Sequence, residues 1–200
     1  MSTRVLDVSH LPPVAQGPRV TIWWGVLSLI AIEATVFGLM VAAYFYLRQN
    51  FAQWPPIGTP PPSLLPGTVN VALLLISLVP MLFVDFSARS EARLPVAVGL
   101  TVCTIIGIAC FVLRVLEFHA MHCRWDSHAY GSVVWTILGM HAGHLVASTI
   151  ENALLVALML RGYVERKHFT DTNVNALYWY FVVLGWLPMY VIIYFAPRVP

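Results

Sequence analysis

Residues 94–113, LPVAVGLTVCTIIGIACFVL, are twenty consecutive residues without a charged side chain. A helix rises about 1.5 Å per residue, so a run of this length crosses the hydrocarbon core of a bilayer, which is roughly 30 Å thick. The apolar character continues, with a few polar residues, to Ala120. The stretch therefore predicts a transmembrane helix over Leu94–Ala120.

Four further stretches are comparably long and apolar, and each predicts a spanning helix: Ile22–Leu47, Leu64–Phe86, Tyr130–Leu160 and Val174–Ala196. Hydrophobic residues make up 59% of the 200-residue chain and charged residues 10%, whereas soluble domains carry about 25% charged residues. This composition excludes a soluble enzyme and a disordered chain. We expect an all-α, polytopic membrane bundle of five transmembrane helices over 22–196, with a tail at 1–21 and a short C-terminal tail at 197–200.

The connectors are short, and one of them, Trp54–Pro62 (WPPIGTPPP), is too rich in proline to be helical. Tryptophans mark several predicted helix ends, as they do at membrane interfaces: Trp23, Trp24, Trp54, Trp125 and Trp179. A charged stretch, a short apolar run and a small-residue cleavage site do not occur in order in the tail, so we expect no cleaved signal peptide.

The basic residues outside the predicted spans divide unevenly between the two sides of the membrane. On the side of the N-terminus are Arg4, Arg19, Arg89, Arg93, Arg161, Arg166 and Lys167. On the other side are Arg48, Arg124 and Arg198. Because basic residues concentrate on the cytoplasmic side, we expect the N-terminus in the cytoplasm and the C-terminus and the proline-rich loop outside.

Neither charge nor cysteine content indicates a soluble partner or a metal. The net charge of +2 is small and scattered, which is not typical of a nucleic-acid-binding protein. Cys103, Cys110 and Cys123 form no CxxC pair and no Cys/His motif, so we predict no metal or haem-attachment site in this chain.

Several polar residues fall at membrane depth, where a charge costs at least about 2.5–3.5 kcal/mol and needs a partner or a function. Glu33 lies near the middle of the first predicted helix, with no cation three or four residues away. Its carboxyl is therefore either neutral or meets a group from another helix. Arg114 and Glu117, three residues apart, share a helix face and are expected to pair.

The fourth predicted helix is the most polar. His141, His144, Ser148 and Glu151 follow one helical stripe, which favours hydrogen bonds between helices over a metal site because no second helix supplies a matching carboxylate–His pair. Gly139 and Gly143 form a small-xxx-small pair, which predicts the close approach of another helix. From the residues alone, the chain is compatible with a transporter, a channel or an accessory subunit.

A series of motifs in a particular order narrows this range. They are Trp23-Trp24-Gly25, Glu33, Trp54-Pro55-Pro56, Asn70, Glu117-Phe118, Tyr130-Gly131-Ser132, Gly139–Leu145 (GMHAGHL) and Tyr178-Trp179. On these helices and loops, over about residues 20 to 196, the chain resembles subunit III of the haem–copper oxidases.

The resemblance implies a five-helix bacterial form that lacks the first two of the family's seven helices and resides in the plasma membrane as a multi-pass protein. Such a subunit carries no haem or copper, which are expected in partner subunits. It packs on the catalytic subunit I, has subunits I and II as partners, binds phospholipid in a cleft and supports proton uptake by a proton-translocating cytochrome c oxidase. Glu33 falls at the family's carbodiimide-reactive carboxylate, and Glu117, His141 and His144 fall at its other characteristic polar positions.

Two departures from the family pattern stand out. After Tyr178-Trp179 the family typically has His-Phe-Val-Asp, whereas this chain has Tyr180 and Val183 at the His and Asp positions. The loss of these groups offers a reason for other buried polar residues, such as Glu151. Ala142 also replaces a glycine of the His-containing motif.

Two alternatives remain open from the sequence. The partner can instead be a quinol oxidase or a nitric oxide reductase, since related five-helix proteins accompany these enzymes. A free-standing proton or lipid transporter that uses Glu33 and the histidine stripe is the other, although the broken helix pairs of an internal repeat are absent from the sequence.

Overall fold

A computed structural model describes residues 21–162 and 164–198, and within these ranges the chain forms five α-helices and a short 3-10 helix. The elements are α1 (Thr21–Asn50), α2 (Leu64–Arg89), α3 (Arg93–His119), α4 (Ala129–Arg161), α5 (Arg166–Tyr194) and η1 (Ala196–Arg198). Each α-helix is long and apolar enough to cross a membrane. The predicted all-α bundle of five membrane-spanning helices is therefore confirmed.

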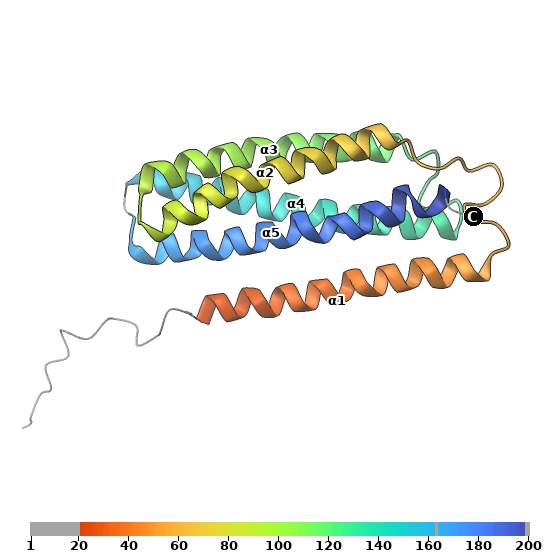
Figure 1. Ribbon diagram of the computed structural model, residues 1–200, viewed down its shortest axis with the longest axis horizontal. Helices are drawn as coiled ribbons and strands as arrows, with labels where there is room; N and C mark the ends of the chain where they lie inside the picture. Colours follow the sequence, from red (N-terminus) through yellow and green to blue (C-terminus); the bar gives the residue numbers. More distant parts are fainter. Residues whose placement is uncertain (1–20, 163, 199–200) are drawn as a thin grey trace, which may run out of the picture.

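Helices α2, α3, α4 and α5 form a four-membered ring in which each helix packs on its two neighbours (Figure 1). Helix α1 lies along one side of this ring and, among the described elements, packs only on α4 and α5. Only Phe37 and Tyr44 of α1 are buried. Most of α1 therefore presents its apolar side chains to lipid or to another protein.

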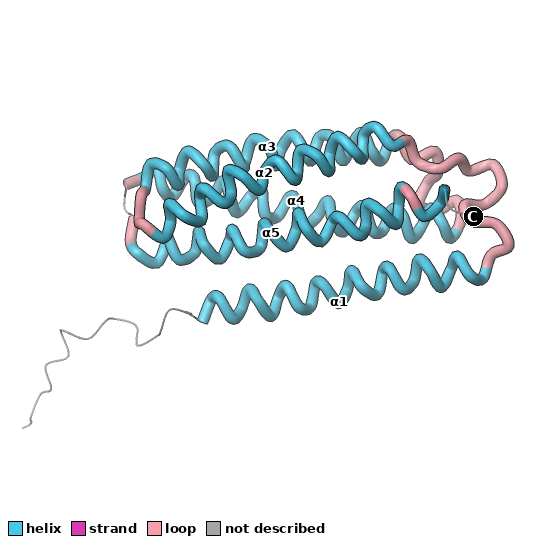
Figure 2. Tube along the Cα trace, viewed as in Figure 1, coloured by secondary structure: helices cyan, strands magenta, loops and turns pink. Residues whose placement is uncertain are grey.

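The connections alternate between the two ends of the bundle (Figure 2). The loops before α2 and before α4 lie at the same end as the described C-terminus, and the α2–α3 and α4–α5 connections lie at the other. Thr59 and His128 join the two loops through a hydrogen bond of 3.0 Å. Arg198 of η1, which follows α5, donates to the carbonyl of Pro62 over 2.5 Å and so attaches η1 to the proline-rich loop.

The proline-rich loop is not helical, as its composition predicts. The predicted cytoplasmic tail lies outside the described residues, apart from Thr21, which begins α1. The predicted C-terminal tail is described only to Arg198. The orientation of the bundle in the membrane therefore stays a prediction.

Helix α5 begins at Arg166, eight residues before the predicted start at Val174. Its first two turns are polar and extend the helix beyond its apolar part. A capping box holds this start, because the side chain of Glu165 accepts from the backbone of His168 while the backbone amide of Glu165 donates to His168 Nδ1 over 2.9 Å. Apolar length predicts the part of a helix in the membrane but not such a capped extension.

The longer α5 also corrects the expected place of Trp179. This residue does not mark a helix end: it lies in the middle of α5, fully buried, and its indole Nε1 donates to Ser77 Oγ of α2 over 3.0 Å. Asn173 of α5 likewise donates to the Asp85 carboxylate of α2 over 2.7 Å. These polar contacts fix α5 against α2.

Candidate functional site: two polar clusters at membrane depth

The first cluster, which we call the core cluster, comprises Asn70, Arg114, Glu117, His141 and Tyr194 and joins four helices. At its centre Arg114 Nη1 donates to Glu117 Oε2 over 2.6 Å, and both side chains are fully buried. The predicted pair therefore forms. Two charges at this depth require further partners, because a desolvated ion pair is stable only when its remaining donors and acceptors are satisfied.

Glu117 receives two more hydrogen bonds from neighbouring helices. Asn70 Nδ2 of α2 donates to Glu117 Oε1 over 2.6 Å, and the Tyr194 hydroxyl of α5 donates to Oε2 over 3.0 Å. A side chain at Gly67 would collide with the ring of Tyr194, so a glycine is needed there. The carboxylate thus binds α2, α3 and α5 together.

His141 is the partner of Arg114 on α4, and its contacts fix the positions of its protons. Arg114 Nη2 can only donate, so His141 Nδ1 accepts, over 2.9 Å. His141 Nε2 faces the carbonyl of Val182 at 3.1 Å, which can only accept, so Nε2 carries the proton. The imidazole is therefore neutral. The ring of Trp186 completes the packing, with the Arg114 guanidinium 4.0 Å from its centroid.

The second cluster, which we call the crevice cluster, comprises Glu33, His144 and Tyr178 and joins α1 to α4 and α5. The Tyr178 hydroxyl donates to Glu33 Oε1 over 3.1 Å, and His144 Nε2 lies 3.4 Å from the same oxygen. Glu33 Oε2 is buried without a hydrogen-bond partner within the described part of the chain. Glu33 therefore meets groups from two other helices, which was one of the two possibilities that its isolation on α1 left open.

The contacts of His144 orient its ring towards Glu33. His144 Nδ1 lies 2.6 Å from the carbonyl of Met140 and must donate to it. The other ring nitrogen, Nε2, faces Glu33 Oε1 at 3.4 Å. The cluster therefore brings a carboxyl, an imidazole and a phenol together near the middle of α1.

A crevice of about 270 Å³ opens beside this cluster, between α1 and the α4–α5 pair. Its lining includes the backbone of Gly139 and Gly143, and a Cβ at either glycine would meet no atom within 4 Å. Among the described residues, no other helix approaches closely at this pair. The close approach occurs instead at Gly107 of α3, where a Cβ would collide with Thr149 of α4.

The predicted polar stripe of α4 does not form one network. His141 turns into the core cluster, His144 turns to α1, and Ser148 is fully buried without a hydrogen-bond partner among the described residues. Glu151 is exposed and belongs to neither cluster. It therefore does not replace the missing His and Asp of α5 inside the core; Val183 is simply packed there, 1% exposed.

The remaining motif residues connect loops and helix ends. Trp54 packs edge-on against the buried ring of Tyr130, with centroids 5.2 Å apart, and Pro55 follows it in the loop. The amide of Gly131 donates to the His128 ring that caps α4, and Ser132 Oγ donates to the carbonyl of Trp125. These residues hold the α3–α4 loop in place.

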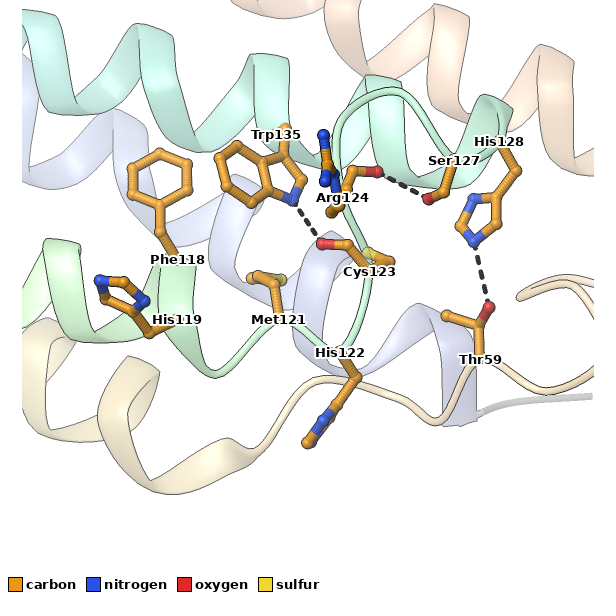
Figure 3. A pocket seen from close by; sticks show the side chains of 10 residues that line it. All are labelled: Thr59, Phe118, His119, Met121, His122, Cys123, Arg124, Ser127, His128 and Trp135. Atoms are coloured by element: carbon orange, nitrogen blue, oxygen red, sulfur yellow. Dashed lines mark hydrogen bonds between the residues drawn. The ribbon is translucent and has the colours of Figure 1, made fainter.

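This loop, Thr59 and the adjoining ends of α3 and α4 border a larger, open hollow of about 580 Å³ (Figure 3). Its wall carries the imidazoles of His119, His122 and His128, and the indole of Trp135 donates to the carbonyl of Cys123 over 2.9 Å. In the described ranges, no three His, Cys, Asp or Glu side chains come together in a metal-binding arrangement.

The sequence did not point to Tyr178 and Tyr194 as members of the clusters, nor to Trp186, which packs on Arg114. Tyr178 was quoted only within a motif, and Trp186 and Tyr194 were not singled out. Their common signal is an aromatic residue with a polar atom inside an apolar helix, but many aromatic residues fit that description. Asn70 was identified only as a motif position, and its role as a donor to Glu117 requires the packing of α2 on α3.

Comparisons with a family model and with known proteins point to the same family. The family model for cytochrome c oxidase subunit III matches residues 4–197. The cytochrome c oxidase subunit 3 of Petromyzon marinus is 26% identical over 192 residues, which cover 92% of this chain and 72% of that protein. The corresponding proteins of Struthio camelus and Formosania lacustris are 27% and 28% identical, with the same coverage.

Proposed function

The chain belongs to the cytochrome c oxidase subunit III family, and from this premise we propose that it is the non-catalytic membrane subunit of a respiratory cytochrome c oxidase. Membership implies a multi-pass membrane protein that associates with other oxidase subunits. We infer that these are subunits I and II, that they hold the haem and copper, and that the complex resides in a bacterial plasma membrane.

The crevice cluster is the observation that carries this proposal. A carboxyl at mid-helix, an imidazole and a phenol lie in a crevice open beside α1. Such groups are expensive at membrane depth and are typical of sites that handle protons. We propose that Glu33 and His144 support proton uptake by the neighbouring catalytic subunit.

The apolar outer surfaces support a stabilising role and lipid binding. Ile32, Leu39 and Tyr46 of α1 are 63%, 63% and 67% exposed, so lipid or a partner subunit must cover this helix in the membrane. The crevice beside Gly139 and Gly143 has room for part of an acyl chain. We propose that phospholipid occupies it and helps to hold the catalytic subunit.

Removal of this subunit from the purified complex tests the proposal. We expect the haem spectrum and the metal content of the remainder to be nearly unchanged, and initial oxidase activity to survive at a reduced rate. Activity over many turnovers should decay faster than in the intact complex and should recover when the subunit is added back. Loss of haem or copper in proportion to this chain would contradict the proposal. So would an oxidase activity that decays over many turnovers at the same rate with and without the subunit.

A further inference from the structure

His128 connects two loops at the end of the bundle that we expect to face outward, and the function proposed above gives it no role. Its Nδ1 accepts a hydrogen bond from the backbone amide of Gly131 over 2.9 Å, which caps the start of α4. Its Nε2 lies 3.0 Å from Thr59 Oγ1 in the proline-rich loop (Figure 3). One imidazole therefore contacts both the first turn of α4 and the loop between α1 and α2.

These two contacts fix the position of the proton on the His128 ring. A backbone amide can only donate, so Nδ1 accepts from Gly131 and carries no proton. The proton of a neutral ring is then on Nε2, which donates to Thr59 Oγ1. Both contacts are therefore made together only by the neutral imidazole in this tautomer.

A second proton on the ring is incompatible with this arrangement. An imidazolium donates from both nitrogens, so its Nδ1–H would face the N–H of Gly131. A positive charge at this place also meets the positive end of the α4 helix dipole. The first turn of α4 lies directly against the α3–α4 loop, since a Cβ at Gly131 would collide with the carbonyl of Arg124. Because the helix start is packed in this way, a protonated ring has to turn away, and it then also loses Thr59.

The groups around His128 offer its charged form no free carboxylate. The other titratable or charged side chains that line the hollow beside it are His119, His122, Cys123 and Arg124. Asp126, in the same loop, is engaged by Arg124 over 3.0 Å. The proline-rich loop has no titratable side chain, and on α4 the phenol ring of Tyr130 lies 6.0 Å from the imidazole. The surroundings therefore favour the neutral ring while the two contacts are made.

We propose that His128 is an acid-sensitive link between the proline-rich loop and the start of α4. The neutral ring caps α4 and holds Thr59, so the two loops are joined. Protonation in an acidic medium breaks both contacts, so the first turn of α4 loosens and the proline-rich loop separates from the α3–α4 loop. Histidine is the side chain whose charge ordinarily changes between about pH 5 and 8, so moderate acidification is enough. The link does not depend on the role proposed for Glu33.

Hydrogen exchange of the full chain in lipid nanodiscs, compared at about pH 8 and about pH 5, tests the cap. Protection of the Gly131 amide is expressed relative to an unfolded peptide at the same pH, which removes the pH dependence of exchange itself. We expect this protection to fall roughly fivefold in acid, the factor that corresponds to a typical N-cap. Over the same range, the nitrogen NMR signals of the His128 ring should change from the Nε2-protonated tautomer to the doubly protonated form.

Spin labels at Ile57→Cys and Trp125→Cys test the separation of the loops. These side chains are 86% and 61% exposed, and they lie in the proline-rich loop and in the α3–α4 loop. In a Cys123→Ala background, we expect the distribution of distances between the labels to broaden in acid. Thr59→Val removes the contact to the loop but keeps the cap. Its labels should therefore show the broad distribution at both pH values, while protection of Gly131 still falls in acid.

His128→Asn separates the cap from the titration, because asparagine caps a helix but takes up no proton in this range. We expect its Gly131 protection to be the same at both pH values. His128→Asp serves the same purpose if the first variant does not fold, since an aspartate cap stays ionised above about pH 5. His122→Asn is the matched control: His122 lines the same hollow but makes neither contact, so this variant should respond like the unaltered chain.

Three results would overturn the link. The first is equal protection of Gly131, or an equal distance distribution of the labels, at both pH values in chains that keep His128 and Thr59. The second is a full response to acid in His128→Asn or His128→Asp, and the third is loss of the response in His122→Asn. The proposed function would survive any of them, because removal of the subunit tests it separately.

Discussion

Arg114 Nη1 lies 2.6 Å from Glu117 Oε2 in a place where neither side chain reaches solvent. Asn70, His141 and Tyr194 supply further hydrogen bonds to the pair from three other helices, while Arg114 Nε is buried without a partner among the described residues. A single ion pair therefore organises the centre of the four-helix ring, and its two halves depend on each other.

Replacement of Arg114 alone should destabilise the fold more than replacement of both Arg114 and Glu117. Arg114→Met leaves the Glu117 carboxylate buried without its cation, and we expect a loss of about 3–5 kcal/mol in the free energy of unfolding. Arg114→Met combined with Glu117→Leu removes both charges and should be less destabilising than Arg114→Met alone. Unfolding measurements in a lipid-like detergent compare the variants. A double variant at least as unstable as the sum of the two single variants would show that the charges act independently.

Gly107 of α3 is closely packed, whereas Gly143 of α4 borders open space. Substitution by alanine should therefore have opposite effects on stability at the two positions. Gly107→Ala pushes a methyl group into Thr149, and overpacking of this kind typically costs about 1–3 kcal/mol. Gly143→Ala meets open space and should leave stability unchanged or raise it by up to about 1 kcal/mol through helix propensity. Thr149→Ala should restore part of the stability of Gly107→Ala. Destabilisation by Gly143→Ala would instead indicate a close helix contact at the crevice.

These contrasts show what the sequence could and could not predict. The spans follow from apolar length, and the Arg114–Glu117 pair follows from helical spacing, because both are local properties. Glu33 and Tyr178 are 145 residues apart, so their contact depends on how α1 lies against α5. The same applies to Gly139 and Gly143, whose spacing is right for a helix contact but whose face of α4 borders the crevice. The polar start of α5 depends on its capping box rather than on apolar length.

Glu33 should react with a hydrophobic carbodiimide in native membranes. The reagent partitions into lipid and attacks neutral carboxyl groups, and the crevice beside α1 gives it access. We expect Glu33→Gln to abolish this modification while the complex still assembles, because the amide keeps the shape of the side chain. Glu117 is the internal control, since its carboxylate is buried in an ion pair and should not be labelled. Mass spectrometry of the labelled peptides identifies the modified residue. Complete loss of assembly in Glu33→Gln would mean that Glu33 is chiefly structural.

The two histidines of α4 should differ in their effect on subunit retention. His141→Ala removes two hydrogen bonds in the core cluster, worth about 0.5–2 kcal/mol each, and leaves Arg114 Nη2 unpaired. His144 is partly exposed, and one of its two polar contacts lies within its own helix, so His144→Ala should weaken the bundle less. The fraction of subunit that stays bound during detergent washing measures the effect, and the haem spectrum should be the same in both variants. Equal loss in the two variants would contradict the division into two clusters.

The excess of basic residues on the side of the N-terminus predicts that the proline-rich loop faces the outside of the cell. Ile57 in this loop is 86% exposed, so Ile57→Cys should react with a membrane-impermeant thiol reagent on intact cells. Ser90→Cys, exposed at the opposite end of the bundle, should react only after lysis.

Burial raises the pKa of the Cys123 thiol, so less thiolate is present at neutral pH, and this residue reacts slowly with the reagent. Both variants are best made in a Cys123→Ala background, because Cys123 lies at the same end as Ile57. Labelling of Ser90→Cys on intact cells, with Ile57→Cys protected until lysis, would reverse the orientation.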